Sequence, residues 1–343
     1  METRAAILVI YTGGTIGMFK DPETGSLRPF NFDELYNYMP SLELFKFKID
    51  SYSFDPIIDS ANINPAYWVK LTEVIAENYE KYDGFVILHG TDTMSYTASA
   101  LSFMLDNLNK PIVITGSQLP LGMIRTDGRD NFITSLEIAG AKSDDIPMIP
   151  EVCIYFENQL FRGNRTHKFN AENFDAFKSV NYPTLANVGV YIKYNEQNIS
   201  KPNFKRLKTY TKLDNNLVVL RLFPGICPNT VKAILSIKGL KGVILETYGA
   251  GNAPTETWFL EAIKSALDAG ILIVNISQCR GGSVEMGKYE TSLDLANMGL
   301  INGKDMTMEA ALTKLMLVMG MEVSNEEAKR LMEKNLKGEI RED

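Results

Sequence analysis

Two threonines follow the first apolar run of the chain, at a position where a catalytic site is expected. Residues 5–10 form a continuous apolar stretch, typical of a buried strand in a parallel sheet, and Tyr11-Thr12-Gly13-Gly14-Thr15 follows. Glycine lets a backbone approach a ligand closely, and open α/β sheets bind ligands at the carboxyl ends of their strands. We therefore predict that Thr15 is a catalytic nucleophile. An ordinary tight turn is the alternative interpretation.

Two further apolar runs end in polar side chains. Residues 85–88 lead into His89-Gly90-Thr91-Asp92, and residues 112–115 lead into Ser117. Apolar positions between them recur at helical spacing from residue 94 to residue 108, so the arrangement predicts a right-handed β-α-β unit with parallel strands. All three loops should then leave the sheet at one edge. The alternative for Thr91 and Asp92 is a role as helix caps.

A threonine hydroxyl needs a base before it can attack a carbonyl carbon. Lys168 can supply that base if burial and its neighbours favour the neutral amine, and Asp92 can orient it. Thr91 is then either a second hydroxyl in the proton path or a nucleophile itself. Backbone N–H groups of the glycine loop would stabilise an oxyanion. Against this, a lysine in a basic loop is often a solvated charge.

A third polar segment, Asp59-Ser60, precedes a helix start at Asn64-Pro65. The Asp59 or Asp92 carboxylate can pair with a ligand ammonium, and Ser60 can donate to a ligand carboxylate. Such a pocket suits a small zwitterion. His89, directly after an apolar run, is better explained as a satisfied buried imidazole than as a base.

The absence of four sequence motifs argues against several common kinds of site. The chain has no GxxxxGK[ST] phosphate loop, no complete GxGxxG turn, no GxSxG elbow and no HExxH pair. It has two histidines and three widely spaced cysteines, so neither a zinc site nor a disulfide framework is expected. We predict catalysis without a metal or a cofactor.

Length and charge bound the remaining classes. With 343 residues, two domains are expected: residues 1–194, a polar linker over 195–213, and residues 214–343. Both halves alternate strand and helix patterns, which predicts an α/β fold with a larger, mainly parallel N-terminal sheet flanked by helices and a smaller C-terminal α/β domain. The net charge of −7 and the lack of a long apolar run argue against nucleic acid and membrane partners. The first strand leaves no room for a signal segment, so a cytoplasmic protein is expected.

Residues 12–17 and 89–94, taken together, resemble the two signatures of the L-asparaginase/glutaminase family. Residues 83–104, 162–168 and 248–254 further resemble its bacterial cytoplasmic type I branch. The resemblance spans nearly the whole chain. It implies hydrolysis of L-asparagine to L-aspartate and ammonia without a cofactor, in a homodimer or homotetramer.

The resemblance also assigns roles to single residues. Thr15 matches the nucleophile that forms an acyl-enzyme, and Thr91, Asp92 and Lys168 match the proton relay. Asp59, Ser60 and Ala61 match the segment that holds the substrate's α-amino and α-carboxylate groups, and Thr91 and Asp92 match further contacts to the substrate. The region of Ser117 matches a backbone contact to the substrate's amide.

Two departures from the family pattern stand out. Many relatives carry a tyrosine in the loop after the first signature, but residues 18–29 contain none; Tyr289 of a neighbouring subunit is one replacement. Where some type I relatives hold regulatory asparagine with an arginine and a threonine, this chain has Glu246 and His167, while Cys279 is retained. Because Glu246 would repel a ligand carboxylate, the sequence disfavours that regulation.

Two other functions share part of this pattern. A glutamine-dependent amidotransferase subunit that acts on charged tRNA carries the same signatures, with an added N-terminal domain that is not expected here. A regulatory amino-acid-binding module would keep the pocket without catalysis, but Thr15, Thr91, Asp92 and Lys168 are all in place. Release of ammonia separates these functions.

Overall fold

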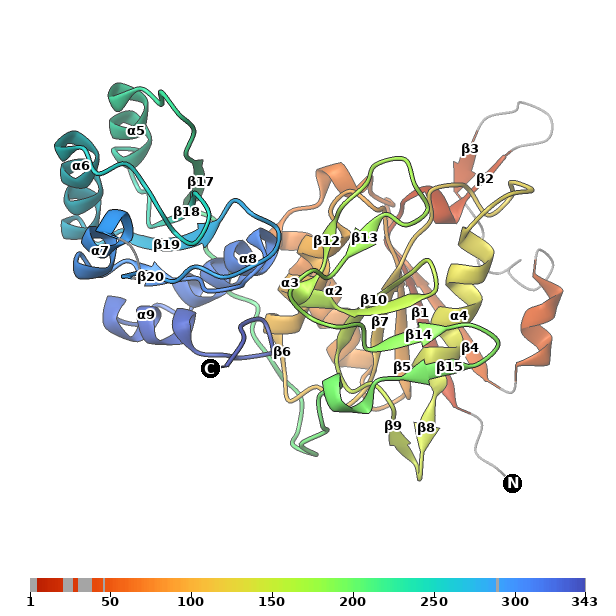
Figure 1. The fold of residues 1–343 in the computed structure, drawn as a ribbon. Coiled ribbons are helices and arrows are strands. Elements are labelled where there is room, and N and C mark those ends of the chain that lie inside the picture. Colours follow the sequence, from red (N-terminus) through yellow and green to blue (C-terminus); the bar gives the residue numbers. More distant parts are fainter. Residues whose placement is uncertain (1–4, 21–26, 30–38, 46, 288–289, 343) are drawn as a thin grey trace. The chain divides into compact units, whose positions relative to one another are not determined.

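The computed structural model describes residues 5–20, 27–29, 39–45, 47–287 and 290–342. The chain divides into two compact units, Met1–Thr209 and Tyr210–Asp343. Figure 1 shows the order of the elements along the chain.

The first unit is built on an eight-stranded sheet with the order β15-β14-β11-β10-β7-β5-β1-β4. Its central strands are parallel, and β11, β14 and β15 are antiparallel to their neighbours. The strand bounds are β1 Ala6–Tyr11, β4 Lys48–Ser53, β5 Gly84–Leu88, β7 Ile112–Thr115, β10 Val152–Phe156, β11 Gln159–Arg162, β14 Ala186–Val188 and β15 Ile192–Tyr194.

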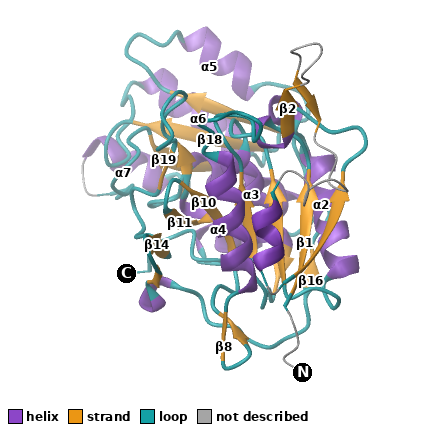
Figure 2. Ribbon diagram, turned by 90° about the vertical axis from the view of Figure 1, so that its right-hand side faces the viewer, coloured by secondary structure: helices purple, strands orange, loops and turns teal. Residues whose placement is uncertain are grey.

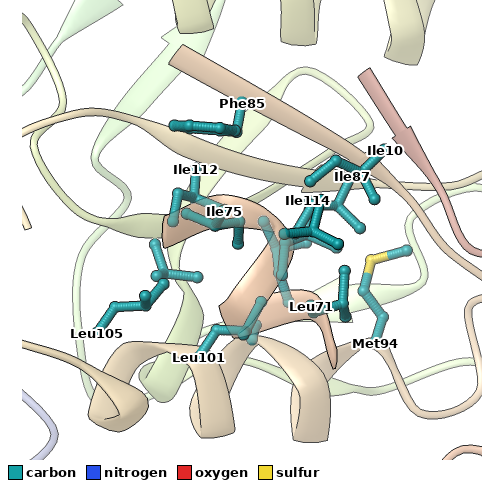
Figure 3. Packing of buried hydrophobic residues seen from close by; sticks show 14 of the residues in the cluster. Ile10, Leu71, Ile75, Phe85, Ile87, Met94, Leu101, Leu105, Ile112 and Ile114 are labelled. Atoms are coloured by element: carbon teal, nitrogen blue, oxygen red, sulfur yellow. The ribbon is translucent and has the colours of Figure 1, made fainter. Parts of the chain in front are cut away.

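Apolar side chains on both faces of β1 and β5 are buried, because helices cover both faces of the sheet (Figure 2). One face packs on α4 (Gly128–Gly140) through side chains such as Val9. The other packs on α2 (Pro65–Asn78) and α3 (Met94–Met104), where Ile10 and Ile87 lie near Leu71 of α2 (Figure 3). The predicted buried strands are therefore confirmed, and they form a rigid base for the loops at their carboxyl ends.

The helix starts follow local chemistry. The Asn64 side chain accepts from the Ala66 N–H at 3.0 Å, and Pro65 occupies the first helical position of α2.

Helix α3 is shorter than predicted: it ends at Met104, and Leu105 already has extended backbone angles. Leu105 pairs instead with Thr209 in a short ladder of β6 (Leu105–Asp106) and β16 (Lys208–Thr209).

Short ladders and turns complete the first unit. Strands β2 (Met18–Lys20) and β3 (Leu27–Pro29) pair antiparallel within the loop after the first signature, whose residues 21–26 lie outside the description. The other short elements are β8 Lys142–Ser143, β9 Ile146–Pro147, β12 His167–Lys168 and β13 Phe177–Lys178, with 3-10 turns η1 Thr15–Gly17, η3 Pro40–Leu44, η4 Ser60–Asn62, η5 Gly163–Arg165 and η6 Glu196–Asn198.

The second unit is a smaller parallel sheet with the order β17-β18-β19-β20. Its strands are β17 Leu217–Arg221, β18 Gly242–Thr247, β19 Leu272–Ser277 and β20 Ile301–Asn302, and its helices are α5 Pro228–Leu235, α6 Thr257–Asp268, α7 Glu290–Asn297, α8 Met308–Gly320 and α9 Asn325–Glu333. One sheet face packs on α5 and α6, and the other packs on α8 and α9. The predicted α/β fold class is confirmed. No helix in the described ranges has the length and apolar character needed to cross a bilayer.

Candidate active site

The two threonines of the first loop have different environments. Thr12 is 2% exposed, and its hydroxyl donates to the Leu88 carbonyl at 3.0 Å. Thr15 is partly exposed and begins the turn η1. Burial and a satisfied hydrogen bond remove Thr12 as a nucleophile. Thr15 is the hydroxyl of this loop that a substrate can reach.

Close backbone contact brings the loops after β1 and β5 together. A Cβ atom on Gly14, which has φ +90°, would lie 2.5 Å from the backbone of Gly90. A Cβ atom on Gly90 would lie 2.4 Å from the Ser60 hydroxyl oxygen. Real Cβ atoms do not approach so closely, so only glycine fits either position. The loops that carry Thr15, Thr91 and Ser60 therefore meet at Gly90.

Lys168 joins two of the predicted site residues directly. Its Nζ donates to Thr91 Oγ1 at 2.8 Å and to Asp92 Oδ1 at 2.7 Å. The lysine side chain is 19% exposed, while that of Asp92 is 65% exposed. Lys168 is thus neither an isolated surface charge nor a sealed ion pair. The hydroxyl of Thr91 accepts from the lysine, so its own proton remains free to be donated.

The alternative role of Thr91 and Asp92 as helix caps is wrong. Helix α3 begins at Met94, and its cap residue is Thr93, whose side chain makes no capping bond. The Thr93 hydroxyl donates instead to the Ser60 carbonyl at 2.7 Å. Thr93 ties the Ser60 turn to the second loop, and Thr91 and Asp92 are left to bond Lys168.

The loop after β7 supports the segment that carries Lys168. Gln118 Nε2 donates to the carbonyls of Ala171 and Asn173, at 3.3 and 3.0 Å, in the hairpin between β12 and β13. Ser117 is buried, and its hydroxyl donates to the Leu119 carbonyl at 2.6 Å. A ligand contact by Ser117 would therefore use its backbone, as the resemblance implies.

Asp59 and Ala61 lie in an exposed turn. One carboxylate oxygen of Asp59 accepts from the Ala61 N–H at 2.9 Å and caps η4. Its other oxygen makes no hydrogen bond to the described part of the chain. Asp59 thus combines a fixed orientation with a free acceptor for a cation.

His89 is fully buried at the start of the second loop. One ring nitrogen, Nδ1, lies 2.6 Å from the Gly90 carbonyl, and the other, Nε2, lies 2.8 Å from Thr97 Oγ1. Burial lowers the pKa of His89 to about 4, so the ring is neutral near pH 7. It is a satisfied imidazole, as predicted, and not a base that faces substrate.

The two residues that stand where some relatives carry a regulatory arginine and threonine, Glu246 and His167, are both buried. Glu246 lies near the end of β18, and its carboxylate is 3.4 Å from Arg221 Nη1. Of the other two positions, His167 is buried and Cys279 is exposed. Tyr289 lies outside the described residues. Within the described ranges, no three His, Cys, Asp or Glu side chains are grouped to hold a metal ion.

These contacts permit acyl-transfer chemistry without a metal. Lys168, Thr91 and Asp92 form a chain of polar groups that can accept and return a proton. The N–H groups of Gly14 and Thr15 meet no acceptor within the described part of the chain, so they are available to stabilise an oxyanion. Thr15 makes no hydrogen bond to Lys168 or Thr91 in the described residues, and its nearness to them follows from the loop contacts.

Two family models match the chain. Residues 6–200 match "Asparaginase, N-terminal", and residues 216–332 match "Glutaminase/Asparaginase C-terminal domain". The chain is 41% identical over 340 residues to L-asparaginase 1 of Escherichia coli (strain K12), which covers 98% of each. It is 40% identical to the 60 kDa lysophospholipase of Mus musculus, over 99% of this chain and 63% of that protein. Its structure is similar to that of L-asparaginase I from Vibrio cholerae, with a TM-score of 0.89 and 39% identity over 99% of this chain and 100% of that one.

Proposed function

The chain belongs to the asparaginase family and is an L-asparagine amidohydrolase, and we propose that Thr15 is the nucleophile of this reaction. The proposal rests on Thr15 being the reachable hydroxyl of the first loop, on its place at the start of η1, and on the loop contact at Gly90. The relay of Thr91, Asp92 and Lys168 supplies the base.

In the proposed reaction, Thr15 Oγ1 attacks the side-chain amide carbon of asparagine. The hydroxyl proton passes through Thr91 to Lys168, and the oxyanion is stabilised by backbone N–H groups. The tetrahedral intermediate then expels ammonia, which takes up the proton that the relay returns. Water attacks the resulting ester by the same relay, releases L-aspartate and restores the Thr15 hydroxyl.

The substrate contacts are part of the same proposal. The free oxygen of Asp59 and the exposed carboxylate of Asp92 would pair with the α-ammonium group. The Ser60 hydroxyl and the turn at Ala61 would hold the α-carboxylate, and the backbone at Ser117 would contact the amide. Asp92 then serves both the relay and the substrate.

A second assignment has an observation in its favour. Lys168 Nζ bonds directly to Thr91 Oγ1 at 2.8 Å, so a neutral lysine is placed to take a proton from Thr91 itself. Thr91 would then be the nucleophile. We favour Thr15, because a hydroxyl oxygen that is already bonded to the base suits a relay better than an attack.

Single-residue variants separate these assignments. Thr15→Ala should bind asparagine but release ammonia at least about 10³-fold more slowly, the scale of a lost nucleophile. Thr12→Val is the matched control, because it removes a buried hydroxyl from the same loop; we expect it to keep kcat within about tenfold. Near-normal turnover by Thr15→Ala would refute the assignment. An assay without tRNA also tests the amidotransferase alternative, which predicts little release of free ammonia.

We also propose that the protein works in the cytoplasm as a homodimer or homotetramer, with L-asparagine as its partner and without nucleic acid or membrane. Light scattering after size-exclusion chromatography tests the assembly. A monomer at micromolar concentration would contradict it.

A further inference from the structure

A chain of buried hydrogen bonds runs from α2 to the second loop. Trp68 Nε1 donates to Thr97 Oγ1 at 3.0 Å, Thr97 Oγ1 lies 2.8 Å from His89 Nε2, and His89 Nδ1 lies 2.6 Å from the Gly90 carbonyl. Trp68 is 5% exposed, and Thr97 and His89 are fully buried. The side chains of Trp68, Thr97 and His89 take no part in the proposed reaction.

The direction of each bond follows from its partners. An indole nitrogen only donates, so Thr97 accepts from Trp68 and has its own proton left for His89 Nε2. A carbonyl only accepts, so the proton of the imidazole is on Nδ1 and is donated to Gly90. The Gly90 carbonyl thus requires the proton of the neutral ring on Nδ1, and the Thr97 hydroxyl completes this tautomer as the donor to Nε2.

Gly90 is the point where the loops meet. Its backbone contacts Gly14 of the first loop and the Ser60 hydroxyl, and its carbonyl belongs to the same planar peptide unit as the Thr91 nitrogen. A rotation of this peptide would turn Thr91 away from Lys168 and would disturb both neighbouring loops. The bond from His89 opposes that rotation.

We propose that His89 is a positioning residue of the hydrolytic site, which holds the Gly90–Thr91 peptide so that Thr91 stays bonded to Lys168 while the Thr15 loop rests on Gly90. The N–H group at Nδ1 is the part of the ring that holds this peptide. The Thr97 hydroxyl, which accepts from Trp68, donates to Nε2 and supports the same tautomer. This inference rests on the proposed function, since it concerns the rate of the same hydrolysis.

Two amide variants separate the two ring nitrogens. In His89→Asn the amide nitrogen takes the place of Nδ1 and can still donate to Gly90, whereas in His89→Gln the longer side chain reaches the place of Nε2 and Thr97 instead. We expect His89→Asn to keep kcat within about fivefold and His89→Gln to lower kcat by about 50-fold, on the scale of a misplaced catalytic group. KM should change by less than kcat in both.

Controls keep the test independent of folding and of the proposed function. Thr72→Val removes a fully buried hydroxyl of α2, which donates to the Trp68 carbonyl at 2.8 Å. It should lower Tm without lowering kcat. Equal kcat losses in His89→Asn and His89→Gln, or a kcat loss in Thr72→Val that accompanies its fall in Tm, would overturn the inference. If the unmodified protein releases no ammonia, the proposed function itself fails instead.

Discussion

Lys168 in the first unit and Lys314 in the second both bond several acceptors, but in different surroundings. Lys168 is partly exposed and bonds a hydroxyl and a carboxylate that solvent can reach. Lys314 is fully buried and bonds the carbonyls of Met332 and Lys334 together with the carboxylate of Glu339. The first arrangement is open to solvent and to a ligand, whereas the second holds the C-terminal segment to α8.

The sheet edges of the two units differ in the same way. In the second unit, Gln278 Nε2 donates to the carbonyls of Leu222 and Glu246 at 2.6 and 2.9 Å. Ser277 donates to the Gly249 carbonyl, and Thr247 donates to Asn275. These polar groups are used to hold the unit's own loops. A carboxyl edge of a parallel sheet therefore becomes a candidate site only where its side chains keep free donors and acceptors.

Replacement of Lys168 should have the largest effect on kcat. Lys168→Met removes the proposed base and keeps the length of the side chain, so we expect kcat to fall by about 10²–10⁴-fold. The unfolding free energy should change little, because the lysine is partly exposed. Steady-state ammonia release and urea unfolding measure the two effects. A variant with nearly full kcat would remove Lys168 from the relay.

The matching change in the second unit should affect stability first. Lys314→Met leaves the buried carboxylate of Glu339 without its partner, which costs about 3–5 kcal/mol of unfolding free energy. Burial lowers the pKa of Lys314, yet Glu339 and two carbonyls keep the amine bonded. Urea unfolding measures the loss, and kcat per folded molecule should be close to that of the unmodified protein. A stable variant with impaired kcat would contradict the division of roles.

The smallest effect is a pair of opposite pH dependences. Burial lowers the pKa of His89 to about 4. As the pH falls, His89 is therefore protonated in the unfolded chain before it is protonated in the folded one, and the unfolding free energy decreases between about pH 6.5 and pH 4. Burial raises the pKa of Glu309 to about 7. The contribution of its protonated carboxyl to the unfolding free energy is therefore fully present below about pH 4.5 and is lost as the pH rises to 7. Each slope is at most about 1.4 kcal/mol per pH unit.

Two variants isolate these slopes. His89→Asn should flatten the acid side of a plot of unfolding free energy against pH, and Glu309→Gln should flatten the neutral side. Urea unfolding at several values between pH 4.5 and 7 provides the plot. Curves parallel to that of the unmodified protein would show that neither group titrates as described.

The sequence was sufficient where local pattern decides the structure. The apolar runs at β1, β5 and β7 predicted buried parallel strands, and the β-α-β rule predicted that their loops share an edge. The extent of α3 was overestimated, because apolar spacing continues to Leu108 while the backbone turns to an extended conformation at Leu105. Tertiary pairing of Leu105 with Thr209, distant in the sequence, is not visible in a local pattern.

The sequence proposes the residue types of the site but not the contacts among them. Nothing in the spacing distinguishes Thr12 from Thr15, since burial and the bond to Leu88 make the difference. The partners of Lys168 lie 76 and 77 positions away. The positions of Trp68 and Thr97 show only a helical periodicity, and their bonds to each other and to His89 depend on packing.

The most direct test of the central claim is to find which hydroxyl carries the acyl group. The protein is mixed with asparagine, quenched in acid during turnover, digested with pepsin and analysed by mass spectrometry. Our account predicts an aspartyl ester on the peptide that contains Thr15. An ester on Thr91, or turnover that leaves Thr15 unmodified under conditions where an acyl-enzyme accumulates, would contradict it.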